Sequence, residues 1–311
     1  MSSHKKQHYV PQCYLREFVD PHTPPKYEPY VWVFSKNGKR KEKRAPKNLF
    51  AETDLYTLTI QGAKDYGIER SLSALESEYA AVVRNKVKKH MSLSGEEQIT
   101  ICAFVAAMMQ RTLRSKDNIE DFHDQVIEKV EAMERLHGLD PCKSAELRES
   151  KADAHRLGVL QLLPDLADLL FKMSLAFLCT EGKGSRFISS DDPVSLFNPD
   201  LQWQRFYGPG LAQQNVEVTM PISPGITACF TWTDLRGYLR LPKYRVEDLN
   251  RMTRAQSYRQ FISDSSKTKR IWFSPIPLRD PRFLLKVVAN FIQRKVADLK
   301  RRYRYGRIRN R

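Results

Sequence analysis

The chain lacks the long apolar run that a membrane-spanning helix requires. Its longest apolar stretch, Ile101 to Met109, is far shorter than the roughly 20 residues of a membrane span. The N-terminus is polar and has no apolar segment after its first charges, so we predict no signal peptide. On these grounds we expect a cytoplasmic protein.

Cysteine is scarce and dispersed. The five cysteines include no pair at CxxC spacing, and three of them (Cys102, Cys179 and Cys229) lie in apolar runs, where a free thiol behaves as a small buried hydrophobe. The sequence therefore predicts neither a disulfide framework nor a structural zinc site.

Several catalytic signatures are also missing. The sequence has no GxxxxGK[ST] phosphate loop, no GxGxxG after a strand, no GxSxG elbow and no HExxH. The PD…ExK arrangement of many nucleases is not evident, and His123, His137 and His155 lack the spacing of zinc ligands. These absences remove the commonest nucleotide-binding, esterase and metalloprotease classes.

Positive charge is abundant, and it is concentrated in two places. The chain of 311 residues has a net charge of +16, of which Lys36 to Lys47 carry +6 and Arg294 to Arg311 carry +8. The rest of the chain is nearly balanced. The candidate nucleic-acid-binding residues are Lys39, Arg40, Lys41, Lys43, Arg44, Arg301, Arg302, Tyr303, Arg304, Tyr305 and Arg307.

Clustered Lys and Arg side chains neutralise phosphates and release condensed counterions, which supplies most sequence-independent affinity for nucleic acid. In the C-terminal cluster, Tyr303 and Tyr305 alternate with arginines and offer rings for unpaired bases. We therefore expect DNA or RNA as the partner. An acidic protein or an acidic membrane surface would be attracted too, and a solvated basic tail is the plain alternative.

Turn and strand signals frame the first charge cluster. Tyr30 to Phe34 reads as a strand that ends at the Asn37-Gly38 turn, and Leu55 to Ile60 reads as a second strand. We expect these two strands to pair as a hairpin with a long basic loop between them.

Hydrophobic periodicity divides the rest of the chain. Residues 66 to 183 have helical spacing, and Pro164 is expected to kink or split the last helical segment, which runs to Leu178. Strands follow at 186–190, 216–222 and 226–232, and helices at 246–263 and 282–303. We predict an α+β fold with a mostly helical middle and a mixed or antiparallel sheet built from N-terminal strands and strands of the C-terminal half. We divide the chain into one α+β domain, 1–281, and a basic C-terminal helix and tail, 282–311.

Short motifs in a fixed order give a family resemblance over about residues 4 to 266. The N-terminal segment His8-Tyr-Val-Pro-Gln-Cys-Tyr-Leu-Arg-Glu-Phe18 resembles the HYVPQ-type opening of an uncharacterised bacterial family, domain of unknown function 4238. Later blocks are similar too: 46–56, Ile68-Glu69 through Glu76, Gln110-Arg111-Thr112, Ser190-Asp191-Asp192-Pro193, Pro221-Ile-Ser-Pro224 and Leu249-Asn250-Arg251. Asp192 departs from the asparagine expected there. The family implies no established activity.

The motif residues suggest a metal-dependent phosphodiesterase (nuclease) site as one hypothesis. Glu69 and Glu76 share a helix face, with Cα atoms about 10.5 Å apart, so they need help from His8 and Asp191 to bind one metal ion. A cluster of histidine and carboxylates suits Mg²⁺ or Mn²⁺. Arg111 would clamp a phosphate and Gln12 would orient a water or a base. Such an enzyme would fit a bacterial defence or toxin-like role.

Plainer interpretations remain open for each motif residue. His8 could anchor a helix, the two glutamates could be solvated charges, and Asp191 could make a side-chain-to-backbone turn before Pro193. Arg111 lies in an otherwise apolar helix, where its charge must be paired or face a cavity. Asn250-Arg251 is expected at the surface. The alternatives are thus a non-enzymatic module that binds nucleic acid or an acidic protein, and an enzyme acting on a small phosphorylated ligand.

Overall fold

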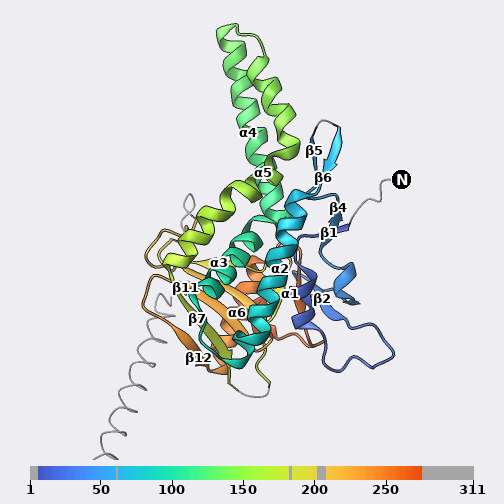
Figure 1. Ribbon diagram of the computed structural model, residues 1–311, viewed down its shortest axis with the longest axis vertical. Coiled ribbons are helices and arrows are strands. Elements are labelled where there is room, and N and C mark those ends of the chain that lie inside the picture. Colours follow the sequence, from blue (N-terminus) through green and yellow to red (C-terminus); the bar gives the residue numbers. More distant parts are fainter. Residues whose placement is uncertain (1–5, 61, 182–183, 202–207, 275–311) are drawn as a thin grey trace, which may run out of the picture.

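The computed structural model describes residues 6–60, 62–181, 184–201 and 208–274. A helical middle lies between strands from both parts of the sequence, which confirms the α+β class (Figure 1). The predicted helix 282–303 and the basic tail lie outside the described residues. Among the helices within these ranges, none is long and apolar enough to cross a membrane.

The N-terminal motif enters the core directly. Strand β1 (Lys6–His8) pairs antiparallel with β4 (Ala51–Thr53), and Pro11 then precedes the short helix α1 (Gln12–Leu15), which continues as a 3-10 turn, Arg16–Phe18. Proline is well suited to the start of a helix because its φ is fixed and it needs no hydrogen-bond acceptor. One apolar face of this segment is buried; it consists of Tyr14, Leu15 and Phe18, each fully buried.

A four-stranded antiparallel sheet holds the first charge cluster, in the order β3-β2-β13-β8. Its strands are β2 (Val31–Ser35), β3 (Lys41–Arg44), β8 (Ser189–Ser190) and β13 (Gln260–Ser263). The Asn37-Gly38 turn is present, with Gly38 at φ 72°. The basic segment is therefore the edge strand of the sheet.

The predicted pairing of the two N-terminal strands is wrong. β2 pairs with β3 and β13, while β5 (Leu58–Ile60) pairs with β6 (Ala63–Asp65). β2 pairs with β3 across the turn at Gly38, and β5 pairs with β6 across the turn at Gly62. Closing such a short loop costs less conformational entropy than closing the long basic loop that the predicted hairpin would need.

The helical middle begins with an amphipathic helix and a buried one. In α2 (Gly67–Asn85), Leu72, Tyr79 and Val83 are among the residues that face the core. Helix α3 (Gly95–Gln110) is apolar on all sides and buried through its middle. The Ser94 and Glu97 side chains form a capping box that satisfies N–H groups at its start. The rings of Tyr79 and Phe104 stack between the two helices.

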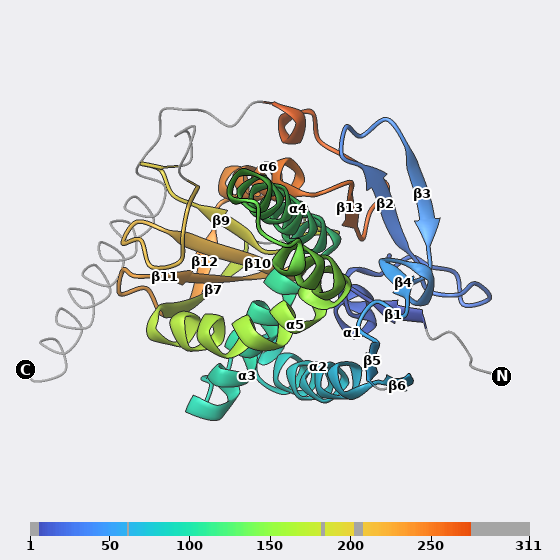
Figure 2. The ribbon, with the colours of Figure 1, turned by 90° about the horizontal axis from the view of Figure 1, so that it is seen from above.

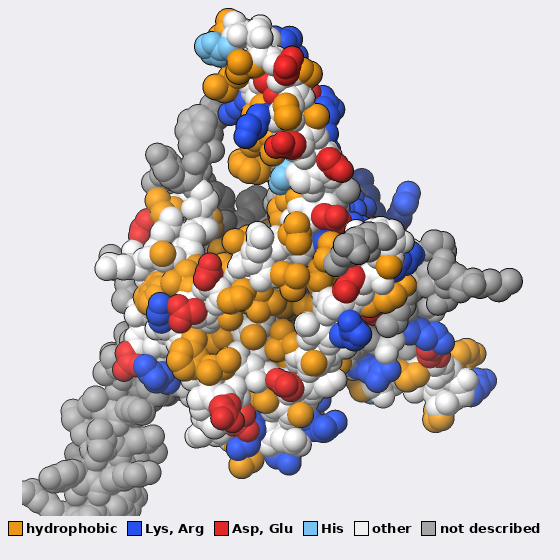
Figure 3. Space-filling view, turned by 45° about the horizontal axis from the view of Figure 1, so that its top comes forward, with side chains coloured by type: hydrophobic (Ala, Val, Ile, Leu, Met, Phe, Trp, Pro, Cys, Tyr) orange, Lys and Arg blue, Asp and Glu red, His pale blue; other side chains and the backbone are white. Residues whose placement is uncertain are grey.

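Two long helices form an antiparallel pair that projects from the molecule (Figure 1). They are α4 (Leu113–His137) and α5 (Cys142–Lys172), and α5 runs through Pro164 as one helix rather than splitting there. Charges of both signs cover the pair, and apolar side chains lie among them (Figure 3). At its far end Leu136 and Leu139 are 80% and 62% exposed.

A five-stranded sheet follows, in the order β12-β7-β11-β10-β9. Only the β12–β7 pair is parallel among these strands. The strands are β7 (Ser174–Thr180), β9 (Ser195–Phe197), β10 (Glu217–Ser223), β11 (Ile226–Thr231) and β12 (Gly237–Leu241). Seen from above, this sheet and the four-stranded sheet lie on opposite sides of the molecule, with α6 (Lys243–Gln256) between them (Figure 2).

Two helix predictions fail in this half of the chain. The apolar run at 174–178, expected as helix, belongs to the buried strand β7, and 260–263, expected at the end of a helix, form β13. A short apolar run that is buried on both faces has no periodicity to tell strand from helix.

The Asn37-Gly38 turn gives the first prediction. A Cβ on Gly38 would lie 2.4 Å from Cζ of Phe273, and its φ is positive. Gly38→Ala should therefore lower the free energy of unfolding by about 2–3 kcal/mol in chemical denaturation. Gly62→Ala, with positive φ but open space, should cost about 1 kcal/mol, and Gly95→Ala almost nothing. Equal changes in the free energy of unfolding at all three positions would contradict the close contact between Gly38 and Phe273.

Candidate functional site

Four of the five predicted catalytic residues meet at one small pocket. It has a volume of about 110 Å³ and lies where β1 and α1 face α2 and the end of α3. Its lining includes His8, Gln12, Glu69, Glu76 and Arg111. Segments of the N-terminal motif and the helical blocks are thus brought together, as the family blocks suggested.

The guanidinium of Arg111 is buried in the wall of this pocket and is held by protein groups. Its Nη1 donates to Oε1 of Glu76 at 2.8 Å, and its Nη2 donates to the carbonyl of His8 at 2.5 Å. The residue is 3% exposed, and the Tyr56 hydroxyl donates to its carbonyl. The two terminal nitrogens that would clamp a phosphate are therefore already engaged, which favours a buried structural network over phosphate binding.

The other pocket residues are also tied to the protein. Nε2 of Gln7 donates to Glu69 and to Thr57, and the Gln7 side-chain oxygen accepts the N–H of Tyr56. Nε2 of His8 donates to the carbonyl of Pro46 at 3.3 Å, so Nδ1 carries the lone pair when the ring is neutral. Burial lowers the pKa of His8, which favours that neutral form.

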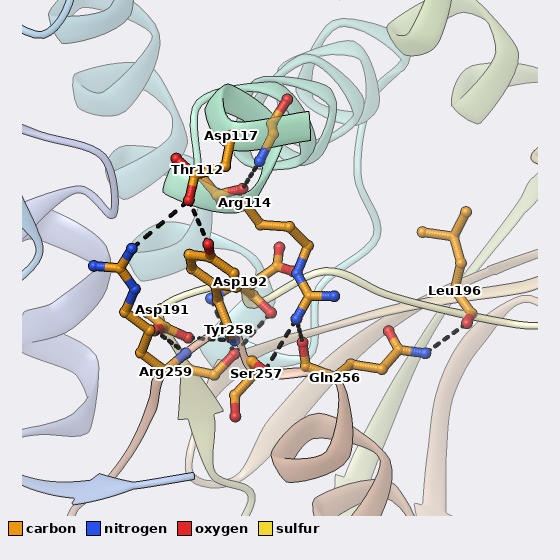
Figure 4. Close-up of polar contacts among 12 residues, drawn as sticks. Thr112, Arg114, Asp117, Asp191, Asp192, Leu196, Gln256, Ser257, Tyr258 and Arg259 are labelled. Carbon is orange, nitrogen blue, oxygen red and sulfur yellow. Dashed lines mark hydrogen bonds and ion pairs between the residues drawn. The ribbon is translucent and has the colours of Figure 1, made fainter. Parts of the chain in front are cut away.

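Asp191 does not line this pocket. Its carboxylate accepts three backbone N–H groups, those of Tyr258, Arg259 and Gln260, at 2.7–2.9 Å. Figure 4 shows it beside Tyr258 and Arg259, just before β13. The carboxylate does bond to backbone, but to a strand far along the chain rather than to a local turn.

The predicted metal ligands do not assemble. Within the residues that the structure describes, no three His, Cys, Asp or Glu side chains are arranged to hold a metal ion. Glu76 is neutralised by Arg111, and Asp191 is engaged at β13. Three of the four predicted ligands, His8, Glu69 and Glu76, thus line the pocket while Asp191 lies elsewhere, and a Mg²⁺ or Mn²⁺ site stays a prediction from the sequence.

A second polar cluster surrounds Asp192, where the resemblance in the sequence led us to expect asparagine. Its Oδ2 lies 2.7 Å from Nε of Arg114 on α4, and Nη2 of Arg114 also donates to the carbonyls of Gln256 and Ser257 (Figure 4). Burial raises the pKa of Asp192 to about 6, although Arg114 lowers it. The cluster joins α4 to the segment between α6 and β13.

A wider groove runs along the four-stranded sheet. It has a volume of about 710 Å³ and is lined by residues of the β2–β3 hairpin and of β13. Four cations border it: Lys39, Arg40, Lys41 and Arg259. The one acid at its border, Glu42, is paired with Arg44. All four side chains of β3 are exposed. We call this the basic groove.

Only part of the groove was predicted from the sequence. Lys39, Arg40 and Lys41 were among the predicted nucleic-acid-binding residues, and Lys43 and Arg44 lie on the same edge strand. Arg259 was missed because it fell inside a predicted helix. Its only local signal is the Phe261-Ile262 pair, which is typical of a strand. The predicted tail residues, Arg301, Arg302, Tyr303, Arg304, Tyr305 and Arg307, lie outside the described residues.

The expected surface position of Asn250-Arg251 is wrong as well. Asn250 is 1% exposed; its amide donates to the carbonyl of Arg186 and its oxygen accepts the N–H of Ile188. Arg251 is 7% exposed and pairs with Asp248 one turn earlier in α6. Asn250 therefore joins α6 to the segment before β8, and Arg251 is paired within its own helix.

The fold and the site define an α+β protein with a buried polar junction and a basic groove. The chain belongs to the family described as "Protein of unknown function (DUF4238)", whose model matches residues 6–268. The resemblance found in the sequence is thus confirmed. No curated protein and no solved structure matches the chain.

The Arg111 network predicts a large loss of stability on truncation. Arg111→Ala should lower the free energy of unfolding by about 3–5 kcal/mol, because Glu76 and the His8 carbonyl lose their partner in a buried place. Arg84→Ala, at an exposed position of α2, should change it by less than about 0.5 kcal/mol. In a double-mutant cycle, Glu76→Ala combined with Arg111→Ala should cost less than the two single changes added. Additive costs would contradict the network.

Asp192 predicts a pH dependence of stability. Its pKa is about 6 in the folded protein and 3.8 as the ordinary value, so the folded state binds the proton more tightly. Its contribution to stability is complete below about pH 4 and is lost as the pH rises through 6, by about 2–3 kcal/mol at most. Denaturation at pH 4 to 7.5 should show a flatter profile for Asp192→Asn. Parallel profiles for the two proteins would refute this assignment.

Proposed function

We propose that the protein binds nucleic acid along the basic groove, without a metal ion. The observation that carries the proposal is the groove itself: about 710 Å³ of open space bordered by Lys39, Arg40, Lys41 and Arg259, with one paired acid. A row of cations attracts a polymer with regularly repeated anions, and the phosphates of a nucleic acid are such anions.

The pairing of the cations supports a free polyanion site. Among the described residues, neither Lys39 nor Arg40 has an ion-pair partner, and Arg259 has only a long contact of 3.6 Å to Asp117. Glu42, the one acid, is taken by Arg44 at 3.0 Å. Exposed cations without acidic partners keep their hydration, and phosphates can displace their counterions at little cost.

Cleavage is left out of this proposal. The metal-dependent phosphodiesterase expected from the sequence needs a ligand set that the described residues do not form. The guanidinium of Arg111 forms a salt bridge with Glu76. The proposal is therefore the binding module that the sequence left open, in the cytoplasm, where nucleic acid is available.

Removing two groove cations tests the proposal. In Lys39→Ala/Arg40→Ala, affinity for labelled DNA or RNA should fall about tenfold, and the dependence of log K on log salt should become shallower by about two phosphates. The measurement is fluorescence anisotropy of the full chain over a salt series, with single- and double-stranded probes.

Lys129→Ala/Lys143→Ala gives the matched control, since it removes the same charge from exposed positions of the α4–α5 pair. Its affinity and salt slope should stay close to those of the unchanged protein. Equal losses in both variants would mean that binding is not localised in the groove. No binding of any probe at low salt would refute the proposed function.

A further inference from the structure

Aromatic rings run along the opposite face of the β2–β3 hairpin. Successive side chains of a strand point to opposite faces, so Val33 and Ser35 face the groove while Trp32 and Phe34 face away from it. Phe34 is buried against Phe261, with ring centroids 5.0 Å apart. Trp32 and then Tyr30 continue the row outward and are partly exposed. The core thus extends to the surface as a row of rings.

Lysines of the edge strand accompany these exposed rings. In the β2–β3 register, Lys43 lies opposite Trp32 and Lys41 opposite Phe34. Nζ of Lys43 is 4.6 Å from the centroid of Tyr30 and 5.0 Å from that of Trp32, and Nζ of Lys41 is 5.7 Å from Trp32. Lys41 also lines the basic groove. The ring row and the groove therefore meet at strand β3.

The Trp32 ring is held in a fixed orientation. Its Nε1 donates to Oδ2 of Asp20 at 2.7 Å, and Asp20 is itself 9% exposed. The ring of Tyr30 stands edge-on to Trp32, with centroids 5.8 Å apart and an interplanar angle of 87°. An indole that is fixed in place loses little conformational entropy when a flat ligand stacks on it. Lysines alone are enough to keep the edge strand β3 from pairing with another chain, so that role does not explain the row of aromatic rings.

We propose that the ligand is single-stranded nucleic acid, whose bases stack on Trp32 and Tyr30 while Lys41 and Lys43 bind the flanking phosphates. The inference rests on the proposed function and specifies its substrate class. Unpaired bases offer ring faces to aromatic side chains, and the same bases in a duplex are covered by their neighbours. The lysine ammonium groups, which lie over the rings in the free protein, would move to phosphates as bases take their place.

The test compares three probes of equal length on the full chain: a thymidine strand, a strand of the same phosphates with abasic sites, and a duplex. The abasic strand keeps the charge and removes the bases. Stacking predicts that the thymidine strand binds at least about tenfold more tightly than the abasic strand, and also more tightly than the duplex. This comparison needs no substitution and so does not depend on the folding of a variant.

Variants then assign the preference to the ring row. Trp32→Leu and Tyr30→Leu should each reduce the ratio between thymidine and abasic affinities severalfold, while Trp32→Phe should keep most of it. Tyr244→Leu is the control, because Tyr244 is 59% exposed with Arg245 over its ring but lies on α6. Tyr30 makes no core contact among the described clusters, so its variant should fold if Trp32→Leu does not.

The outcomes separate the two proposals. Equal affinities for the three probes, or a preference for the duplex, would overturn the single-strand inference and leave nucleic-acid binding in place. A thymidine preference that persists unchanged in Tyr30→Leu and Trp32→Leu would also overturn it, because the stacking would then occur elsewhere in the chain. Failure to bind any probe at low salt would instead overturn the proposed function on which the inference rests.

Discussion

A buried guanidinium must be neutralised where the N-terminal segment meets the helical layer, and much of the structure is arranged around that need. Arg111 follows the last turn of α3, bonds to Glu76 on α2 and holds the carbonyl of His8 in β1. Removing a guanidinium from water is costly unless its hydrogen bonds are replaced. Three elements that are distant in sequence are thereby fixed in one arrangement.

Buried polar groups also connect distant segments in the second half of the chain. Asp191 accepts three successive N–H groups at the start of β13, and Asn250 joins α6 to the strand segment at Arg186 and Ile188. These residues lie in the short blocks that carry the family resemblance. Asp191 and Asn250 thus form long-range polar connections, which a fold with several small sheets needs more than a fold with one continuous core.

The sequence predicts those features that depend on interactions between residues close together in the chain. The helical spacing of α2 and the turn at Asn37-Gly38 are local patterns, and they were predicted correctly. The pocket residues on α2 were also expected to share a face. The second partner of β2 could not be predicted, because it is β13, more than 200 residues away and recognisable only after folding. Strand β3 has four charged residues and no apolar alternation, so periodicity gave no sign of it.

The role of the candidate site residues could not be predicted for a related reason. Charged residues in an apolar setting indicate that partners exist, but the sequence does not say whether the partners are protein groups or a ligand. Glu76 and Arg111 neutralise one another, and Asp191 accepts hydrogen bonds from backbone N–H groups, so the residues with the strongest motif signal already have protein partners. The cations of the β2–β3 hairpin are the reverse case: they are exposed, few acids accompany them, and partly exposed rings lie beside them. Exposed positive charge next to partly exposed aromatic surface can bind a partner from outside the chain, and this places the argument for function on the hairpin rather than on the motif residues.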